Sequence, residues 1–437
     1  MIKLGRSFWW VFLLTGIGFF ISRLPWLIDN PIFLRLAAAL LVLLGVSFVW
    51  TSISLWNISL RRSTRTMRKQ VGEVFLEDFS IVNASFLPKL WIKVTDRALD
   101  LGGKGSKVIT AIGANQTWSY VAFTPLNKRG WFTLGPTQVE SGDIFGLFLA
   151  LKTYQTNMRL LVIPYMVDVQ FFLAPFGILP GGHTMQEKTL EVTPYAAGVR
   201  EYVAGDPLKR IHWPSSARKQ VLIVKEFEKD PLAEVWLFLD SRRSVHIRSD
   251  SSGFPSLHPV LWVRKRKAFK LPPDTAEYAI SITASIAKYY TEQKREVGLV
   301  SAGQSYTVLP AEKGERQLGK ILETLAVLEP EGDLPLWALV NSQISNLSRG
   351  STVLLITPST DEKILTISLE MIHRGLIPVL ILIDPSSFGG DERTDELSAK
   401  LSNHGVVNFV VQEGDDLKAV LETPQAMFDP RYMARPF

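Results

Sequence analysis

Twenty-five consecutive residues, 36–60, carry no charged side chain. At about 1.5 Å per residue, a helix of this length can cross a hydrocarbon core of ~30 Å. A second uncharged run lies upstream at 7–22, and Asp29-Asn30-Pro31 between the runs is typical of a tight turn. The pattern predicts two transmembrane helices that form a hairpin and are followed by a basic juxtamembrane segment, all within residues 1–69.

Tryptophan residues lie near the ends of both runs, where aromatic rings anchor spans at the membrane interface. They are Trp9, Trp10, Trp26, Trp50 and Trp56. A cleaved signal peptide is the alternative for the first run. The hairpin is favoured because no small-residue cleavage site follows the first run before the second begins.

Basic residues set the expected orientation of the hairpin. Lys3 and Arg6 precede the first run, and only Arg23 and Arg35 lie near the connecting turn. Five more follow the second run, namely Arg61, Arg62, Arg65, Arg68 and Lys69. Because Lys and Arg near span ends stay on the cytoplasmic side, we expect a multi-pass protein of the cell membrane. Both termini and the soluble domains should be cytoplasmic.

The basic excess of the chain belongs to this membrane segment. Residues 1–69 contain nine Lys/Arg and one Asp, whereas the other residues contain 39 basic and 41 acidic side chains, a net charge of −2. Nucleic acid is therefore disfavoured as a partner. The chain has no cysteine, which excludes disulfides, thiolate zinc sites and a cysteine nucleophile.

Two different patterns follow the membrane segment. Short alternating apolar runs separated by turn residues predict an all-β sandwich over residues 70–170. Apolar strand runs that alternate with helical periods predict an α/β domain with a mostly parallel sheet over 231–437. Residues 171–230 should link the two domains.

The linking segment is unusually rich in Gly, Asp, Pro, His, Trp and basic residues between Val199 and Glu228. Gly205-Asp206-Pro207 predicts a turn, because Gly tolerates positive φ and Pro restricts the residue before it. The remaining distinctive residues are Arg200, Tyr202, Arg210, His212, Trp213, Ala217, Arg218, Lys225 and Glu226. We interpret the segment as a structural clasp, with a catalytic use of His212 and Asp206 as the alternative.

This segment resembles the signature of the domain-of-unknown-function family 58. A second match lies upstream, in order, at Arg129, Gly130, Gly135, Pro136, Asp143, Phe145 and Gly146, although the family usually has Pro where this chain has Ile144. The resemblance implies a membrane-anchored protein with a β-rich module and a von Willebrand factor A-like, Rossmann-like α/β domain. It also implies a MoxR-type AAA+ ATPase as partner, because such genes commonly neighbour those of the family.

A metal site of von Willebrand factor A type would need Asp-x-Ser-x-Ser after the first α/β strand, because Mg²⁺ prefers oxygen ligands. Here Asp240 and Ser244 keep two of those positions, but Arg242 occupies the middle one. A guanidinium can donate hydrogen bonds and cannot ligate a cation. We therefore expect no metal and no other cofactor, with Mg²⁺ bound at this motif as the alternative.

Two further segments stand out. Gly314–Lys320 resembles a phosphate-binding loop but lacks the following Ser or Thr, so we interpret it as a chance match. The basic run 262–270 is expected in a solvated loop, with contact to anionic lipid as the alternative.

No Gly-x-Ser-x-Gly elbow and no paired histidine spacing appears in the sequence, so no catalytic residue is assigned. The expected function is a membrane-anchored scaffold or adaptor that binds protein partners. The alternative is a component of an envelope enzyme system with an active site near Asp206 and His212.

Overall fold

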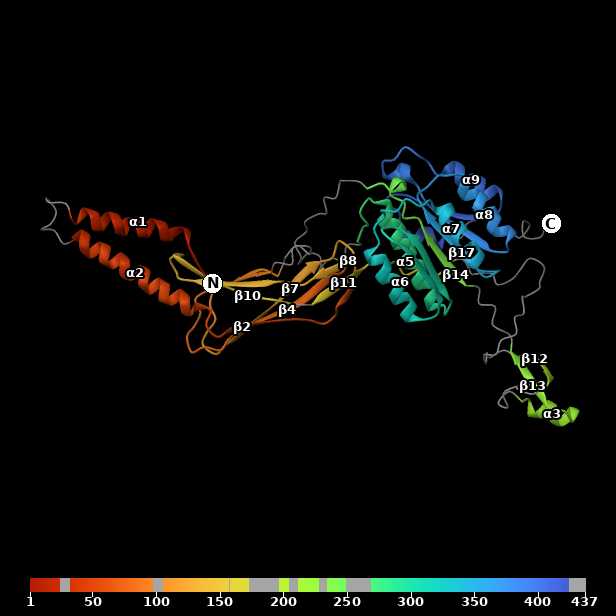
Figure 1. Ribbon diagram of the computed structural model, residues 1–437, viewed down its shortest axis with the longest axis horizontal. Coiled ribbons are helices and arrows are strands. Elements are labelled where there is room, and N and C mark those ends of the chain that lie inside the picture. Colours follow the sequence, from red (N-terminus) through yellow and green to blue (C-terminus); the bar gives the residue numbers. More distant parts are fainter. Residues whose placement is uncertain are drawn as a thin grey trace. The chain divides into compact units, whose positions relative to one another are not determined.

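The computed structural model describes residues 1–23, 32–96, 105–156, 158–172, 196–203, 211–227, 234–248 and 269–423. The chain divides into two compact units, residues 1–163 with 255–269, and residues 164–254 with 270–437. The first unit contains two N-terminal helices and a β-region, and the second contains a mixed α/β domain (Figure 1). This order of helices, β-region and α/β domain confirms the coarse architecture predicted from the sequence.

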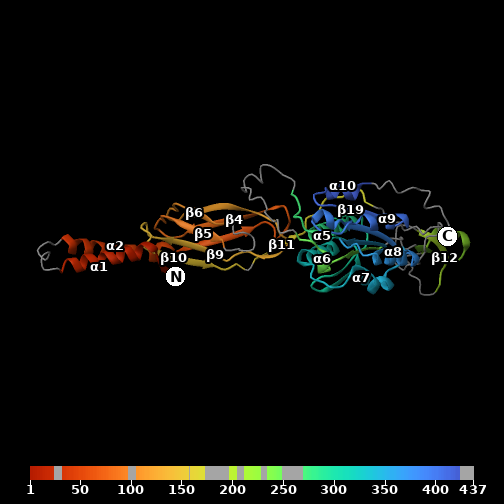
Figure 2. The same cartoon turned by 90° about the horizontal axis from the view of Figure 1, so that it is seen from above.

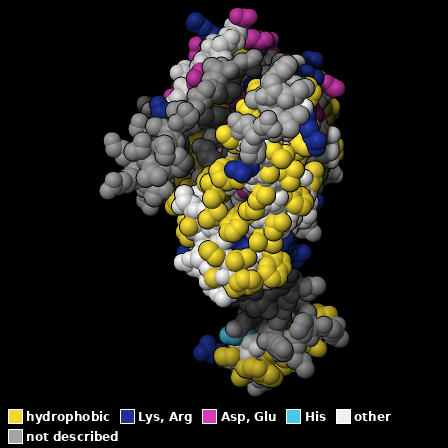
Figure 3. Space-filling model, turned by 90° about the vertical axis from the view of Figure 1, so that its left-hand side faces the viewer, with side chains coloured by type: hydrophobic (Ala, Val, Ile, Leu, Met, Phe, Trp, Pro, Cys, Tyr) yellow, Lys and Arg dark blue, Asp and Glu magenta, His cyan; other side chains and the backbone are white. Residues whose placement is uncertain are grey.

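The two helices are α1 (Arg6–Ile21) and α2 (Ile32–Ser54). Among the described residues, α2 is the helix long and apolar enough to cross a membrane, and α1 is a shorter apolar helix of 16 residues. A Cβ added at Gly18 of α1 would lie 3.5 Å from the Cβ of Ala37 on α2, so small residues let the helices approach closely. Hydrophobic side chains gather on the side of the molecule that carries these helices (Figure 3). The predicted turn at 29–31 lies outside the described residues.

A short strand precedes the helical hairpin. Strand β1 (Ile2–Leu4) pairs antiparallel with β10 (Phe148–Tyr154), and the Gly5 N–H donates to the Leu147 carbonyl at 2.7 Å. The chain re-enters the β-region at β2 (Ile58–Thr64), directly after α2. The hairpin therefore leaves and returns at the same end of the β-region (Figure 2).

The β-region is a sandwich. One sheet has the order β1-β10-β9-β5-β6, the facing sheet β2-β4-β7, and a small third sheet β3-β11-β8. The remaining bounds are β3 (Arg68–Gln70), β4 (Val74–Asn83), β5 (Ile92–Asp96), β6 (Lys107–Ile109), β7 (Thr117–Pro125), β8 (Gly130–Thr133), β9 (Thr137–Gly142) and β11 (Arg159–Ile163). The core between the two larger sheets contains Phe79, Ile81, Ile92 and Val139, which the alternation of inward and outward residues places inside.

The basic stretch after α2 differs from its prediction as a juxtamembrane segment. Residues 58–64 and 68–70 form β2 and β3 of the β-region, and α2 ends at Ser54. Arg62 points inward from β2, where its side chain is only 4% exposed. It forms ion pairs with Glu77 at 2.6 Å and with Asp96 at 3.1 Å, and its guanidinium lies over the Phe79 ring. One buried cation thus joins carboxylates from both sheets.

The α/β domain has a six-stranded sheet in the order β16-β15-β14-β17-β18-β19, which is the 3-2-1-4-5-6 order of doubly wound folds. All strands run parallel except the edge strand β16, which is antiparallel to β15. The strands are β14 (Val235–Leu239), β15 (Val297–Ala302), β16 (Tyr306–Glu312), β17 (Thr352–Thr357), β18 (Ile377–Ile383) and β19 (Val407–Val411). The prediction of a mostly parallel sheet is confirmed.

Helices cover both faces of this sheet because its strands are apolar on both sides. Helix α5 (Thr275–Glu292) packs on β14, β15, β17 and β18, and α6 (Glu315–Val327) packs beside it. Trp236 and Phe238 of β14 belong instead to the core of the opposite face. That core includes residues from α7 (Leu336–Gln343), α8 (Lys363–His373) and α9 (Asp395–Asn403). The last helix, α10 (Leu417–Glu422), packs on β19.

A segment that precedes the α/β domain in sequence is part of its packing. The Val167 N–H donates to the Ser285 hydroxyl on α5, and Lys288 forms an ion pair with Asp168. Phe172 stacks on Phe409 of β19 with ring centroids 5.4 Å apart. Residues 164–172 therefore form a strap over α5, a helix whose side chains are almost all buried.

Candidate functional site

The candidate site lies where β14 and β17 end side by side. In doubly wound sheets, ligands bind outside the carboxyl ends of the strands at the point where successive crossovers diverge to opposite faces. The crossover after β14 contains α5, and the crossover after β17 contains α8, which lies on the other face. Asp240 and Thr357 stand at this switch point: Asp240 directly follows β14, Thr357 is the last residue of β17, and both are buried.

The Asp240 carboxylate is held inside the protein. It is 1% exposed, and it accepts hydrogen bonds from the Thr357 hydroxyl at 2.7 Å and the Arg242 backbone N–H at 3.1 Å. Thr357 in turn accepts from the Ser359 N–H at 2.9 Å. Burial raises the pKa of Asp240, and these hydrogen bonds only partly oppose it.

Further hydrogen bonds join neighbouring elements to the backbone around Asp240. The Ser241 hydroxyl lies 2.8 Å from the hydroxyl of Ser301 at the end of β15. His246 Nε2 lies 3.0 Å from the Asp240 carbonyl oxygen, so this nitrogen carries the proton, and Nδ1 faces Thr275 at the start of α5. Ser301, His246 and Thr275 could not be predicted as site residues, because none of them belongs to a recognisable motif.

Arg242 stands at the rim of the site. Its Nη2 lies 3.4 Å from the Ser359 hydroxyl, and within the described part of the chain its buried Nε has no hydrogen-bond partner. The loop that carries Arg242 is fixed by Gly332, whose N–H donates to the Ser241 carbonyl and whose carbonyl accepts from the Arg243 N–H. A donor-rich side chain of this kind suits a carboxylate ligand.

The two predicted metal-site positions are not brought together. Asp240 is buried, whereas Ser244 is exposed on the 3-10 turn Arg243–Val245. Across the described residues, no group of three or more His, Asp or Glu side chains could hold a metal ion. Lys320 of the phosphate-loop-like sequence lies on α6 and pairs with Glu312 at 2.7 Å.

The pKa of Asp240 yields a testable pH dependence. A carboxyl group whose pKa is raised by folding stabilises the fold below its unfolded pKa of ~3.9 and loses that contribution as the pH rises through the folded value. The Asp240→Asn variant should therefore become more stable relative to the unmodified protein as the pH rises above about 4. Urea unfolding of both proteins across this range measures the change, and a difference that does not vary with pH would contradict it.

The signature segment forms a small unit of its own. Strand β12 (Ala196–Glu201) pairs with β13 (Ile223–Phe227), and helix α3 (Trp213–Lys219) lies between them in sequence. Arg200, Lys225 and Glu226 lie on these strands, and Tyr202 directly follows β12. Ala217, Arg218 and Trp213 are exposed on α3. Gly205, Asp206, Pro207 and Arg210 lie outside the described residues, as do residues 262–268 of the basic run.

His212 and Ser216 fix this unit. The His212 N–H donates to the Ile223 carbonyl at 2.7 Å, and His212 Nδ1 lies 2.7 Å from the Ser215 hydroxyl. The Ser216 hydroxyl accepts from the Ile223 N–H at 2.8 Å. These contacts tie the start of α3 to β13, a structural use of His212 that the sequence pattern did not specify.

The upstream motif forms a loop at the end of β9. Asp143 is buried, and its carboxylate accepts from the backbone N–H groups of Phe145, Leu147 and Phe148 at 2.7–3.1 Å. Gly146 adopts a φ of +68°, which favours glycine. Gly130 begins β8 and Gly135 precedes Pro136, while Arg129 is half-buried beside them.

Comparison with known proteins confirms the predicted resemblance. Residues 198–254 match the family model described as "Protein of unknown function DUF58". The chain is 22% identical over 254 residues to the "Uncharacterized protein YeaD" of Bacillus subtilis (strain 168), an alignment that spans 58% of this chain and 56% of the relative. The chain thus matches little more than half the length of this relative.

Solved structures give weak matches. The crystal structure of the CARDB domain of the PF1109 protein from Pyrococcus furiosus aligns with 24% of this chain and 87% of that chain, at 7% identity and a TM-score of 0.17. A GH20 exo-β-N-acetylglucosaminidase from Vibrio harveyi aligns with 79% of this chain and 59% of that chain, at 10% identity and a TM-score of 0.18.

Proposed function

We propose that this protein is a membrane-anchored adaptor whose α/β domain binds an acidic segment of a protein partner at the switch point. The observation that carries the proposal is the division of roles between two charged residues. The Asp240 carboxylate is occupied by the Thr357 hydroxyl and a backbone amide, whereas the guanidinium of half-buried Arg242 has one long contact, to Ser359, and a buried Nε without a hydrogen-bond partner among the described residues. An arginine fork pairs with a partner carboxylate through charge-assisted hydrogen bonds.

The anchor in this proposal is the full helical hairpin. β1 pairs with β10, and β2 follows α2 into the same β-region, which supports a first crossing in α1 and a return crossing in α2. At ~1.5 Å per residue α1 is about 24 Å long, close to a hydrocarbon core. Lys3 precedes α1 and Arg6 is its first residue, which supports cytoplasmic termini and cytoplasmic soluble units.

The partner we propose is a MoxR-type AAA+ ATPase, and the α/β domain would then be a von Willebrand factor A-like module that binds without a metal. The doubly wound strand order and the place of Asp240 at the end of β14 support this assignment. In this proposal the Arg242 side chain, in place of a metal ion, binds a carboxylate of the partner. Loss of one member of such a buried charge pair typically costs 2–5 kcal/mol of binding, so affinity should fall at least tenfold.

Capture of the ATPase tests this proposal. The detergent-solubilised full chain is compared with Arg242→Glu, and Arg243→Glu on the exposed neighbouring residue serves as the matched control. Bound proteins are identified and quantified by mass spectrometry. We expect the unmodified chain and the control to capture a MoxR-type ATPase, and Arg242→Glu to lose most of it. Equal capture by all three proteins would overturn the role of Arg242, and circular dichroism of each variant confirms that it folds.

A further inference from the structure

Two loops at the end of the β-region that receives the helical hairpin present apolar side chains to solvent. The loop 84–91 exposes Phe86 and Leu90, and the loop 143–147 exposes Ile144 and Phe145. Phe86 and Ile144 are 69% and 73% exposed. Exposed apolar side chains grouped in this way mark an interaction surface. We call these two segments the base loops.

The loop 143–147 exposes the side chains of Ile144 and Phe145 near the start of α1. The Asp143 carboxylate gathers three backbone N–H groups of the loop, so the loop has a defined shape. Gly5 contacts it so closely that an added Cβ would lie 1.8 Å from the Gly146 carbonyl oxygen. Helix α1 begins at the next residue, Arg6. Ile144 and Phe145 are thus displayed beside the point where α1 leaves the β-region.

The loop 84–91 is attached in a similar way to the end of α2. Lys89 Nζ donates to the Ile53 carbonyl at 2.9 Å, near the C-terminus of the helix. Asn83 donates to the Leu87 carbonyl at 2.9 Å and accepts from the Ser85 hydroxyl at 2.7 Å, which fixes the loop internally. The ring of Phe86 meets Trp56, just beyond α2, edge to face at 6.1 Å.

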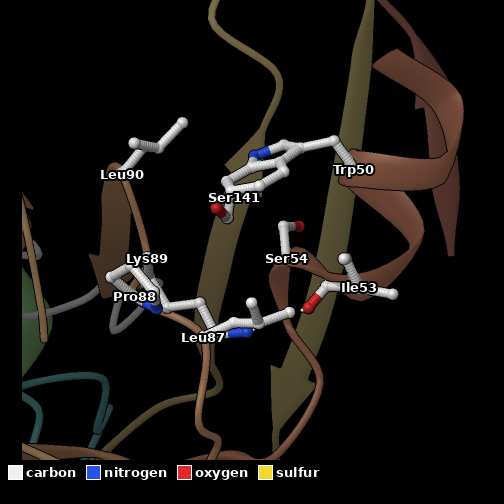
Figure 4. A pocket seen from close by; sticks show the side chains of 8 residues that line it. All are labelled: Trp50, Ile53, Ser54, Leu87, Pro88, Lys89, Leu90 and Ser141. Atoms are coloured by element: carbon white, nitrogen blue, oxygen red, sulfur yellow. Dashed lines mark hydrogen bonds between the residues drawn. The ribbon is translucent and has the colours of Figure 1, made fainter. Parts of the chain in front are cut away.

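The contact between this loop and α2 is closely packed. Trp50, Ile53 and Ser54 of α2 face Leu87, Pro88, Lys89 and Leu90 across a hollow with room for about one water molecule (Figure 4). Lys89 is 3% exposed, and burial lowers its pKa. The hollow is too small for an organic ligand. The packing around it holds the loop 84–91 in a fixed position relative to the end of α2.

We propose that the base loops insert into the interfacial layer of the bilayer, so that the β-region rests on the membrane by its loops as well as by its helices. Helices α1 and α2, which adjoin the base loops, also expose apolar side chains, and hydrophobic side chains gather on this side of the molecule (Figure 3). Neither loop has an acidic residue apart from the buried Asp143, and the exposed Lys3 and Arg6 lie beside the loop 143–147. Aromatic residues prefer this layer, and basic residues favour anionic headgroups. The inference rests on the membrane anchor proposed above.

The absence of cysteine from the sequence makes a site-specific test direct, because one introduced cysteine carries one label. The variants Phe86→Cys and Phe145→Cys are labelled with an environment-sensitive fluorophore in the full chain. They are reconstituted into vesicles of phosphatidylcholine and phosphatidylglycerol. Val121→Cys and Val108→Cys on β7 and β6, which are also exposed apolar residues, are the matched controls. Val42→Cys on α2 reports the anchor itself.

We expect nitroxide-labelled lipids to reduce the fluorescence at positions 86, 145 and 42, and aqueous iodide to reduce it at positions 108 and 121. Quenching by iodide but not by lipid at 86 and 145, with lipid quenching retained at 42, would overturn the insertion of the base loops and leave the anchor standing. Absence of lipid quenching at 42 would overturn both. Protection of 86 and 145 from both quenchers would show a protein contact instead, and would also overturn the inference.

Discussion

Replacement of Arg62 by methionine is expected to lower the free energy of unfolding of the β-region by about 3–5 kcal/mol, the cost of breaking a buried charge pair on one side. Methionine is close in length, so packing changes little. The carboxylates of Glu77 and Asp96, which Arg62 contacts at 2.6 and 3.1 Å, lose their buried counter-charge. Hydrogen exchange of β4 and β7 peptides, followed against denaturant concentration, measures the loss within the β-region.

Arg61→Met is the matched control for this prediction. Arg61 is adjacent on β2, but its side chain points to the exposed face, where a substitution should change stability by less than about 0.5 kcal/mol. Comparable losses in the two variants would mean that the position on β2, rather than the buried charge cluster, determines the effect.

The same cluster should respond to pH in a defined direction. Burial raises the pKa of Glu77, and the nearby Arg62 opposes this rise only in part. A carboxyl whose folded pKa is raised contributes its stability in acid and loses it as the pH rises above about 4.5. Without Arg62 the Glu77 carboxyl group favours the protonated form still more. The loss of unfolding free energy caused by Arg62→Met should therefore be smallest in acid and grow toward neutral pH.

Gly332→Ala should destabilise the α/β domain by about 3 kcal/mol, at the upper end of the costs of overpacking a protein interior. An added Cβ at this residue would lie 1.8 Å from the Ala302 carbonyl oxygen and 3.2 Å from that of Ser241. Both are backbone atoms at the ends of central strands, so they cannot move aside like a flexible side chain. Denaturant unfolding monitored by exchange of β14 and β15 peptides gives the magnitude.

The backbone displacement that an alanine at position 332 causes should also alter the candidate site, because Gly332 exchanges hydrogen bonds with Ser241 and Arg243 on either side of Arg242. Partner capture should fall together with stability in Gly332→Ala. The neighbouring exposed residue provides the control, since Asp333→Ala should leave both stability and capture unchanged. A stable Gly332→Ala protein would show that the backbone around residue 332 relaxes without cost.

Local patterns were sufficient to predict the α/β domain. The run 235–239 is continuously apolar because its strand is covered on both faces, and the structure places β14 at those residues. Two short helices, α7 and α10, were not predicted because each is too short for a helical period to be distinguished from a turn. Asp240 was recognisable because it directly follows a buried run.

The beginning of the β-region could not be predicted in the same way. Ile58–Thr64 contains two arginines after an apolar helix, a pattern that also marks the end of a membrane span. Only the partners of Arg62 distinguish the two cases, and they lie 15 and 34 residues further along the chain. Single-sequence patterns contain no information on such pairings. The contacts of Arg242 with Ser359 depend in the same way on a residue 117 positions away.

The pairing of β1 with β10 has a consequence for biosynthesis. Residues 2–4 are made almost 150 residues before their partners at 148–150. A pairing so distant in sequence forms slowly, because the intervening chain must be ordered before the contact stabilises it. The five-stranded sheet therefore stays incomplete at its β1 edge until β1 pairs with the finished β10. Between the synthesis of β10 and this pairing, the open edge of β10 can accept the first strand of a second copy of the chain.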